Sequence, residues 1–268
     1  AFSRLFDSIK NKTPVIPLSG GFDSRSIAAY VKKMGIKKAI FYTYGKKNSY
    51  EVSIAKKVCK RLGFNLICIE YNSCNWEKLF EEGGENYIEY SHNYSALPHV
   101  QEYPSIYYLN KNHLIPKDSV FVPGFCGDYL GGSLFPCVSK LTELKNIKAL
   151  SEYIYDTRYS LWLDRPITEA EKNELKNKIS EDLPHCPVDG ECNIINAYES
   201  WEIKNYISKY IINALRVYEY FGYEWRMPLW DIELMSNWYN IPIKTKREGI
   251  YNKYLNKCLF KKLGIDYN

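Results

Sequence analysis

The 268-residue sequence lacks any apolar run of the roughly 18–20 residues that cross a bilayer. Its first residues, Ala1 to Arg4, show no basic segment followed by an apolar stretch, which is the pattern of a signal peptide. Internal repeats and blocks of one charge are also absent. The net charge of +5 comes from 36 basic and 31 acidic residues spread along the chain, without the basic patch of a nucleic-acid-binding protein. We therefore expect a cytoplasmic protein with no membrane span and no nucleic-acid partner.

Cysteine pairs of the C-x-x-C type are absent too, although the chain has eight cysteines. Scattered cysteines in a chain without an export signal are mostly reduced core residues. The nearest approach to a metal-ligand cluster is His185-Cys186 with Cys192, and no second pair at short spacing accompanies it. We therefore expect an ordinary loop there rather than a structural zinc site.

What is present predicts a well-packed globular protein, since 46% of the residues are apolar and 25% are charged. In the first half, short β-branched or aromatic runs alternate with helical patterns, as in βαβ units. These runs predict strands at 13–18, 39–44, 66–71 and 119–122, helices at 2–11, 24–34 and 49–62, and an irregular helical stretch at 75–115. Beyond about 135 we expect no strand, and helices at 140–158, 168–182, 193–222 and 245–263.

The predicted fold is therefore α/β. Residues 1–135 form a doubly wound parallel sheet that binds a nucleotide, and residues 136–268 form a mostly helical part that holds the acceptor substrate.

The most informative string is Pro17-Leu18-Ser19-Gly20-Gly21-Phe22-Asp23-Ser24, between a predicted strand and a predicted helix. The two glycines let the backbone approach an anion, and the helix amino terminus adds partial positive charge. An Asp beside a phosphate is repulsive without a cation between them, so Asp23 predicts Mg²⁺ bridging to phosphate oxygens. The spacing fits neither GxxxxGK[ST] nor GxGxxG. The simpler alternative is a tight turn in which Ser and Asp only cap the helix.

This string resembles the SGGxDS pyrophosphate loop of the ATP-pyrophosphatase superfamily, whose members cleave ATP between the α and β phosphates. The resemblance implies ATP and Mg²⁺ as cofactors, with Asp23 as a metal ligand. It also implies that the nucleotide contacts Leu18, Ser19, Gly20, Gly21, Asp23 and Ser24.

Two further segments resemble the synthase domain of asparagine synthetase. The run from Phe41 to Gly45, followed by Glu51-x-x-x-Ala55, is similar to that family's second βα unit, which implies that Tyr44 lies against adenine. The run from Pro123 to Gly132 is similar to the family's second glycine loop. The resemblance implies that Gly124 contacts the nucleotide and that Asp128 shares Mg²⁺ with Asp23. Independently, the carboxyl ends of neighbouring parallel strands are where α/β sheets bind ligands.

A third segment, Glu224 to Asp231 followed by Ile241-Pro242, resembles the family's ExRxPxxD…P pattern, after which a lysine contacts pyrophosphate. The resemblance implies catalytic cations among Lys253, Lys246 and Arg226. The choice among Lys244, Lys246 and Lys253 stays open, and we favour Lys253, which opens a helix after Gly249 as in the family's glycine–lysine segment. Lys246 and Arg247, in the preceding loop, are the fallback. The plainer interpretation is that these cations are solvated, and that Trp230 and Asp231 serve core packing and helix capping.

The chain also departs from the family. Phe125 or Cys126 stands where the commonest asparagine synthetase has a glutamate, so the acceptor side of the site should differ. The 268 residues contain no counterpart of the family's glutaminase domain, which leaves an amine, ammonia or a separate glutaminase as the nitrogen source.

The resemblance implies an ATP-dependent amide ligase. A small-molecule carboxylate is adenylated with release of pyrophosphate, and an amine or ammonia then displaces AMP. Relatives that act in surface-polysaccharide synthesis are expected to amidate sugar acids. Two alternatives remain open: a sulfur-transferring tRNA modifier of the same superfamily, in which Cys126 would be the reactive group, and a nucleotide-binding module without turnover.

Overall fold

The computed structural model describes residues 1–72, 76, 80–132, 140–141, 143–160, 167–184 and 191–267. The chain forms two compact units. Residues 1–132 and 210–268 make the first, which we call the sheet unit, and residues 133–209 make the second. The sequence-based division at 135/136 lies close to the point where the chain leaves the sheet unit. The two divisions differ in the last 59 residues, which the sequence assigns to the second part, because the chain from Tyr210 onward belongs to the sheet unit. The His185-Cys186 pair lies outside the described residues.

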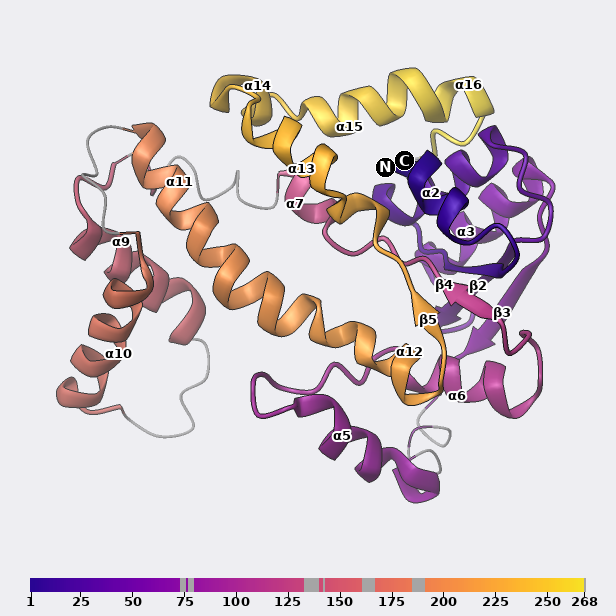
Figure 1. The fold of residues 1–268 in the computed structure, drawn as a ribbon, viewed down its shortest axis with the longest axis horizontal. Helices are drawn as coiled ribbons and strands as arrows, with labels where there is room; N and C mark the ends of the chain where they lie inside the picture. Colours follow the sequence, from indigo (N-terminus) through magenta and orange to yellow (C-terminus); the bar gives the residue numbers. More distant parts are fainter. Residues whose placement is uncertain are drawn as a thin grey trace. The chain divides into compact units, whose positions relative to one another are not determined.

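The sheet is five-stranded and parallel throughout, in the order β3-β2-β1-β4-β5. Its strands are β1 (Thr13–Pro17), β2 (Ile40–Gly45), β3 (Leu66–Glu70), β4 (Ser119–Phe121) and β5 (Glu224–Trp225). The chain runs outward from β1 to β3, then returns to the other side of β1 with β4, so the strand order reverses between β1 and β4 (Figure 1). The doubly wound α/β fold is thus confirmed. Ligands bind such sheets in the crevice at this reversal.

One strand contradicts the expectation that none follows residue 135. β5 pairs with β4 in the register Val120 with Glu224 and Phe121 with Trp225. A two-residue strand shows no measurable alternation in the sequence, and only its tertiary partner makes it a strand.

The helices of the sheet unit have bounds close to the predicted ones, with more breaks. Before β4 they are α1 (Phe2–Ser8), α2 (Phe22–Lys33), α3 (Tyr50–Leu62), η1 (Phe80–Gly84), α5 (Glu85–His92) and α6 (Tyr103–Lys111). After β4 they are α7 (Gly127–Gly131), η4 (Asn213–Leu215), α12 (Arg216–Tyr220), η5 (Pro228–Trp230), α13 (Ile232–Tyr239), α14 (Ile243–Arg247), α15 (Ile250–Tyr254), η6 (Leu255–Phe260) and α16 (Lys261–Leu263).

The second unit is helical in the residues described. It contains α9 (Ile147–Ile154), η2 (Tyr155–Tyr159), α10 (Glu169–Asp182), α11 (Glu191–Glu202) and most of η3 (Ile203–Ile211). α10 begins with a capping box, in which Thr168 and Glu171 bond each other's backbone amides. In the described part of the chain, no helix is both long and apolar enough to cross a bilayer.

Alternating residues of the sheet enter two apolar clusters, one on each face. Ile16, Phe41 and Val120 pack with α1, α2, α3 and the carboxy-terminal segment, through Leu255, Leu259 and Phe260 of η6 and Ile265, which follows α16. Val15, Tyr42 and Phe121 pack with α5, α6 and α12 (Figure 1). Because both faces are covered, the carboxyl edge of the strands is left as the place for a site.

Candidate functional site

A cavity of about 430 Å³ opens at the carboxyl ends of β1, β2 and β4. It contains eight of the residues expected to hold the nucleotide or its metal. These are Leu18, Ser19, Gly21, Asp23, Ser24, Tyr44, Gly124 and Asp128. The other lining residues are Pro17, Thr43, Glu51, Gln101, Glu102, Pro123 and Phe125. The ninth expected residue, Gly20, is not among the lining residues, and a Cβ there would lie 3.2 Å from the Glu51 Cα on α3.

Hydrogen bonds of two serine hydroxyls fix the conformation of the loop after β1. The Ser24 Oγ accepts from the Ser19 amide at 3.0 Å, and the two serine hydroxyls are also 3.0 Å apart. The Ser19 hydroxyl accepts from the Gly21 amide at 3.1 Å. α2 begins after Gly21 with no side chain capping its first turn. The loop therefore presents hydroxyl and amide donors beside an uncapped helix amino terminus, which suits a phosphate group.

The glycines of the second loop allow it to pack directly on the start of α2. A Cβ at Gly124 would lie 2.9 Å from the Ser24 amide nitrogen, and a Cβ at Gly127 would overlap the Asp23 carboxyl group. Between them Cys126 has a φ of 66°, a conformation that costs a non-glycine residue about 1–3 kcal/mol. Such strain persists only where the surroundings enforce it, and here it brings Asp128 toward Asp23.

Asp23 and Asp128 form a close pair of carboxyl groups at the cavity wall. Burial, and then the charge of Asp128, raise the pKa of Asp23 to about 7. One hydrogen bond acts in the opposite direction, because the Tyr251 hydroxyl donates to Asp23 Oδ1 at 3.1 Å. A half-buried carboxylate beside an exposed one, with like charges that repel, is a suitable donor set for a divalent cation.

The fit to Mg²⁺ requires a nucleotide as well. Among the residues described, no group of three or more His, Cys, Asp or Glu side chains could enclose a metal ion. Mg²⁺ is usually bound by one or two carboxylates together with substrate phosphates. The Asp pair beside the phosphate-type loop has that composition, so the residues present fit the metal that the sequence resemblance implies.

The three expected cations are not among the residues lining the cavity in the described structure. Lys253 is exposed on α15, and Arg226 pairs with Glu224 at 2.9 Å. Lys246 is 2% exposed, and its ammonium lies 5.2 Å from the centre of the Trp238 ring. Lys253 shares the short helix α15 with Tyr251, whose hydroxyl contacts Asp23.

Sequence reasoning missed Glu102, which lines the cavity although the residue is only 2% exposed. Its carboxyl group accepts hydrogen bonds from the hydroxyls of Tyr42 and, at 2.9 Å, Tyr218. Burial raises the pKa of Glu102. Tyr44 stacks on Tyr71 with the ring centres 5.0 Å apart, which provides an aromatic wall beside this group. No local pattern signals Glu102, because the two tyrosines that bond it come from other segments of the chain.

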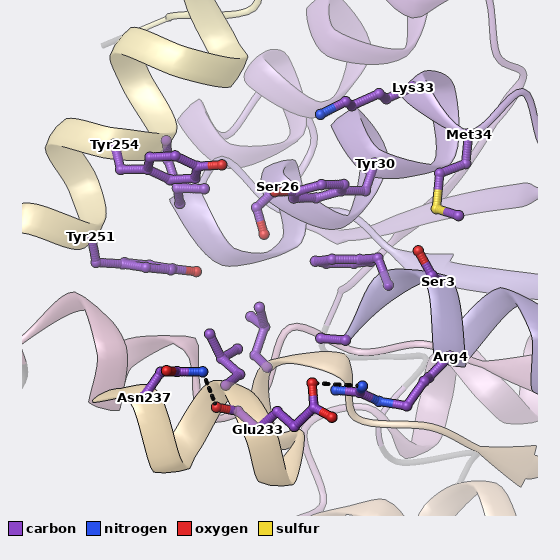
Figure 2. A pocket seen from close by; sticks show the side chains of 15 residues that line it. Ser3, Arg4, Ser26, Tyr30, Lys33, Met34, Glu233, Asn237, Tyr251 and Tyr254 are labelled. Carbon is purple, nitrogen blue, oxygen red and sulfur yellow. Dashed lines mark hydrogen bonds and ion pairs between the residues drawn. The ribbon is translucent and has the colours of Figure 1, made fainter. Parts of the chain in front are cut away.

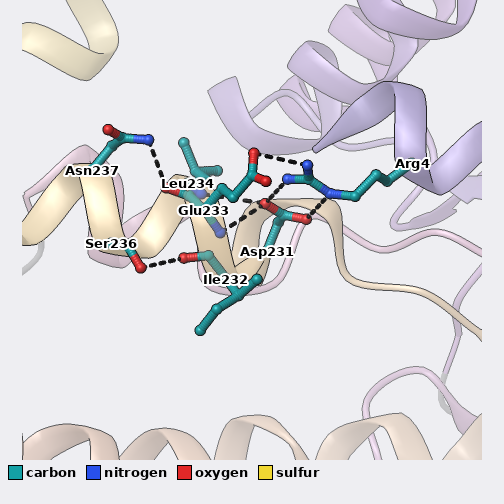
Figure 3. A network of polar contacts seen from close by, with 7 residues as sticks. All are labelled: Arg4, Asp231, Ile232, Glu233, Leu234, Ser236 and Asn237. Atoms are coloured by element: carbon teal, nitrogen blue, oxygen red, sulfur yellow. Dashed lines mark hydrogen bonds and ion pairs between the residues drawn. The ribbon is translucent and has the colours of Figure 1, made fainter.

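Asp231 serves structure, as its capping interpretation predicts. It accepts from the amides of Glu233 and Leu234 at the start of α13, and it pairs with the Arg4 guanidinium (Figure 3). Arg4 also pairs with Glu233 at 2.7 Å and so ties α1 to α13. This network holds α13 in place and contributes no group to the cavity described above.

Comparison with known proteins gives one family match. The sequence profile of the family described as "Queuosine biosynthesis protein QueC" matches residues 13–100, which include the loop after β1 and the Tyr44 segment. The match covers about a third of the chain and supports placing this segment in the ATP-pyrophosphatase superfamily. No curated protein matches the chain.

Among solved structures, the chain is similar to the NH3-dependent NAD synthetase from Campylobacter jejuni subsp. jejuni NCTC 11168 in complex with the nitrate ion. The identity is 14%, the match covers 69% of this chain and 95% of that chain, and the TM-score is 0.34. A similarity this low adds no argument about function.

Proposed function

We propose that the protein is an ATP-dependent ligase that adenylates a carboxylate, releases pyrophosphate, and passes the acyl group to an amine or ammonia. The observation behind this proposal is the single cavity that joins the Ser19–Ser24 loop, the Asp23–Asp128 pair and the Tyr44 wall. The family match over residues 13–100 supports the nucleotide chemistry. Sugar acids of surface polysaccharides are the carboxylate class we favour, because the aromatic-rich run from Asn213 to Asp231 resembles relatives that act in surface-polysaccharide synthesis.

Each part of the chain has a role in this reaction. Tyr44 and Leu18, which line the cavity, would flank the adenine, and the loop amides and the two serine hydroxyls would receive the β and γ phosphates as the leaving group. Asp23 and Asp128 would hold Mg²⁺, which neutralises charge on the pyrophosphate. The fixed loop positions the α phosphate toward the attacking carboxylate, so positioning and charge neutralisation supply most of the catalysis.

The structure does not favour the sulfur-transfer alternative. Sulfur transfer requires a thiolate, and a reactive cysteine has a lowered pKa and an electropositive, accessible environment. Burial, followed by the charges of Asp128 and Asp23, instead raises the pKa of the Cys126 thiol to about 12. Cys126 is therefore a packed loop residue next to the carboxylates rather than a sulfur carrier.

Identifying the nucleotide products tests the proposal. The purified protein is incubated with ATP, Mg²⁺ and a panel of sugar acids and amino acids, with ammonium chloride as nitrogen source, and the nucleotides are separated by chromatography. We expect AMP and pyrophosphate in equal amounts, dependent on Mg²⁺ and on one class of acid. Release of ADP and phosphate would contradict the assignment. ATP binding without turnover for every acid would favour the nucleotide-binding module instead.

A further inference from the structure

We propose that Tyr251 is a positioning residue that orients the Asp23 carboxylate for its metal and ties the carboxy-terminal helix α15 to the metal pair. This inference rests on the proposed function, because it concerns the same Asp23–Asp128 site. It adds a residue that neither the sequence pattern nor the comparisons assign.

The geometry begins at Gly249, which precedes α15 with a φ of 67° and ends the turn from α14. Tyr251 is the second residue of α15, and its half-buried ring runs along the wall of a separate cavity of about 530 Å³. Figure 2 shows the ring projecting from α15, on the same wall of this cavity as Tyr254, with Ser26 of α2 near its hydroxyl end. The hydroxyl reaches past this cavity and donates to Asp23 Oδ1 at 3.1 Å.

This bond fixes one oxygen of a carboxylate that is already closely packed. Asp23 lies against Gly127, where even a Cβ would overlap it, and Asp128 repels it. Among the described residues, two side chains hydrogen-bond the Asp23 carboxyl group: the Tyr251 hydroxyl, which donates to Oδ1, and the carboxyl group of Asp128. A phenol that holds one carboxylate oxygen leaves the second oxygen for a metal ion, as the outer partners of metal ligands commonly do.

The same bond connects two elements that the reaction needs together. Tyr251 lies two residues before Lys253, the exposed lysine of α15. α15 also packs on α7, since a Cβ at Gly131 would lie 3.7 Å from both the Tyr251 ring and the Asn252 side chain. Occupation of the Asp23–Asp128 pair should therefore fix α15, and with it the position of Lys253.

The test uses Tyr251→Phe, which keeps the ring and removes only the hydroxyl. Tyr254→Phe is the matched control, because it removes a hydroxyl from the same helix one turn away, where the side chain is about half exposed. For both variants and the wild type, the thermal stabilisation at fixed ATP is followed while the free Mg²⁺ concentration is raised. Titration calorimetry of ATP without metal is measured in parallel.

We expect Tyr251→Phe to need about 10–100 times more Mg²⁺ for half of the stabilisation, the usual cost of losing an outer partner of a metal ligand. Its melting temperature without ligand and its metal-free ATP affinity should stay close to wild type, and Tyr254→Phe should titrate like wild type. A Tyr251→Phe titration equal to that of wild type would overturn the inference, and so would an equal shift in Tyr254→Phe. If the wild type itself shows no Mg²⁺-dependent ATP binding, the proposed function fails, which is a separate result.

Discussion

At the scale of single residues, Asp23 is a carboxyl group whose negative charge is unfavourable where it lies, and we propose it as a ligand of Mg²⁺. Its pKa is raised to about 7 in the folded protein, first by burial and then by Asp128. A carboxyl group with a raised pKa stabilises the fold only while it is protonated. The stability it contributes is complete at a pH below its unfolded pKa near 4, and it is lost as the pH rises through about 7. The ligand-free protein should therefore lose stability for this reason as the pH rises from about 4 to about 7.

Asp23→Asn should separate the effect of the Asp23 charge on stability from the role of Asp23 in binding Mg-ATP. The amide is isosteric and uncharged, so the ligand-free variant should be more stable than wild type at pH 8, by on the order of 2 kcal/mol, and nearly equal to it at pH 4. Mg-ATP, which at 100 times its dissociation constant stabilises a binding protein by about 2.7 kcal/mol, should no longer do so. Melting curves at both pH values, with and without Mg-ATP, measure both effects. Equal stabilisation of variant and wild type by Mg-ATP would remove Asp23 as a metal ligand.

The sequence predicts residues of this site where they are neighbours in the chain. Ser19, Gly21, Asp23 and Ser24 belong to one short string, so their chemistry could be read together. Tyr251 could not be found that way, because it is 228 residues away from the Asp23 side chain it contacts. Glu102 is equally hidden, since its tyrosine partners lie 60 and 116 residues away. Long-range packing, which a single sequence does not display, assembles these contacts.

At the scale of elements, hydrophobic periodicity located the long helices and regular strands. α10 was predicted at 168–182 and occupies Glu169–Asp182. The last predicted helix, 245–263, is instead divided among α14, α15, η6 and α16, because Gly249 has a positive φ and starts a new helix. Lys246, before this break, is buried, whereas Lys253, after it, is exposed.

The two lysines should consequently respond differently to alanine. Lys253→Ala should lower kcat by about 10²–10³-fold with little change in the KM for ATP, as for a cation that acts on the departing pyrophosphate, and should leave the melting temperature nearly unchanged. Lys246→Ala should mainly destabilise the protein, by about 1–3 kcal/mol, because the buried side chain packs its stem and ammonium against Trp238 and Tyr239. Steady-state kinetics and melting curves are compared for both variants. If Lys253→Ala keeps more than half of the wild-type kcat, α15 supplies no catalytic lysine.

At the scale of the whole molecule, the sheet unit is discontinuous in sequence. Composition and periodicity predicted a sheet domain that ends near residue 135, and the first four strands agree with it. The return of residues 210–268 could not be predicted, because helices that cover a sheet have the same amphipathic pattern as helices of a separate domain. The returning segment also supports the phosphate loop. The buried Arg25 guanidinium donates to the carbonyls of Gly20, Ile265 and Tyr267 and so joins the loop to the carboxy-terminal segment.

A chain limited to residues 1–135 should therefore not fold. The missing segment contributes eight buried side chains to the two cores of the sheet: Leu215, Val217, Tyr218, Tyr223, Leu255, Leu259, Phe260 and Ile265. At about 1.5–3 kcal/mol for each buried side chain, their loss is on the order of 10–20 kcal/mol, as large as the whole stability of a typical domain.

We expect the 1–135 fragment to show no cooperative thermal transition, no near-ultraviolet circular dichroism and no Mg-ATP binding, whereas the full chain shows all three. Residues 1–135 with residues 210–268 supplied as a separate peptide are the matched control. Recovery of a cooperative transition in that mixture would show that the missing core contacts, rather than the break itself, caused the loss. A cooperative transition with Mg-ATP binding by the 1–135 fragment alone would mean that the carboxy-terminal helices only cover a sheet that is already stable.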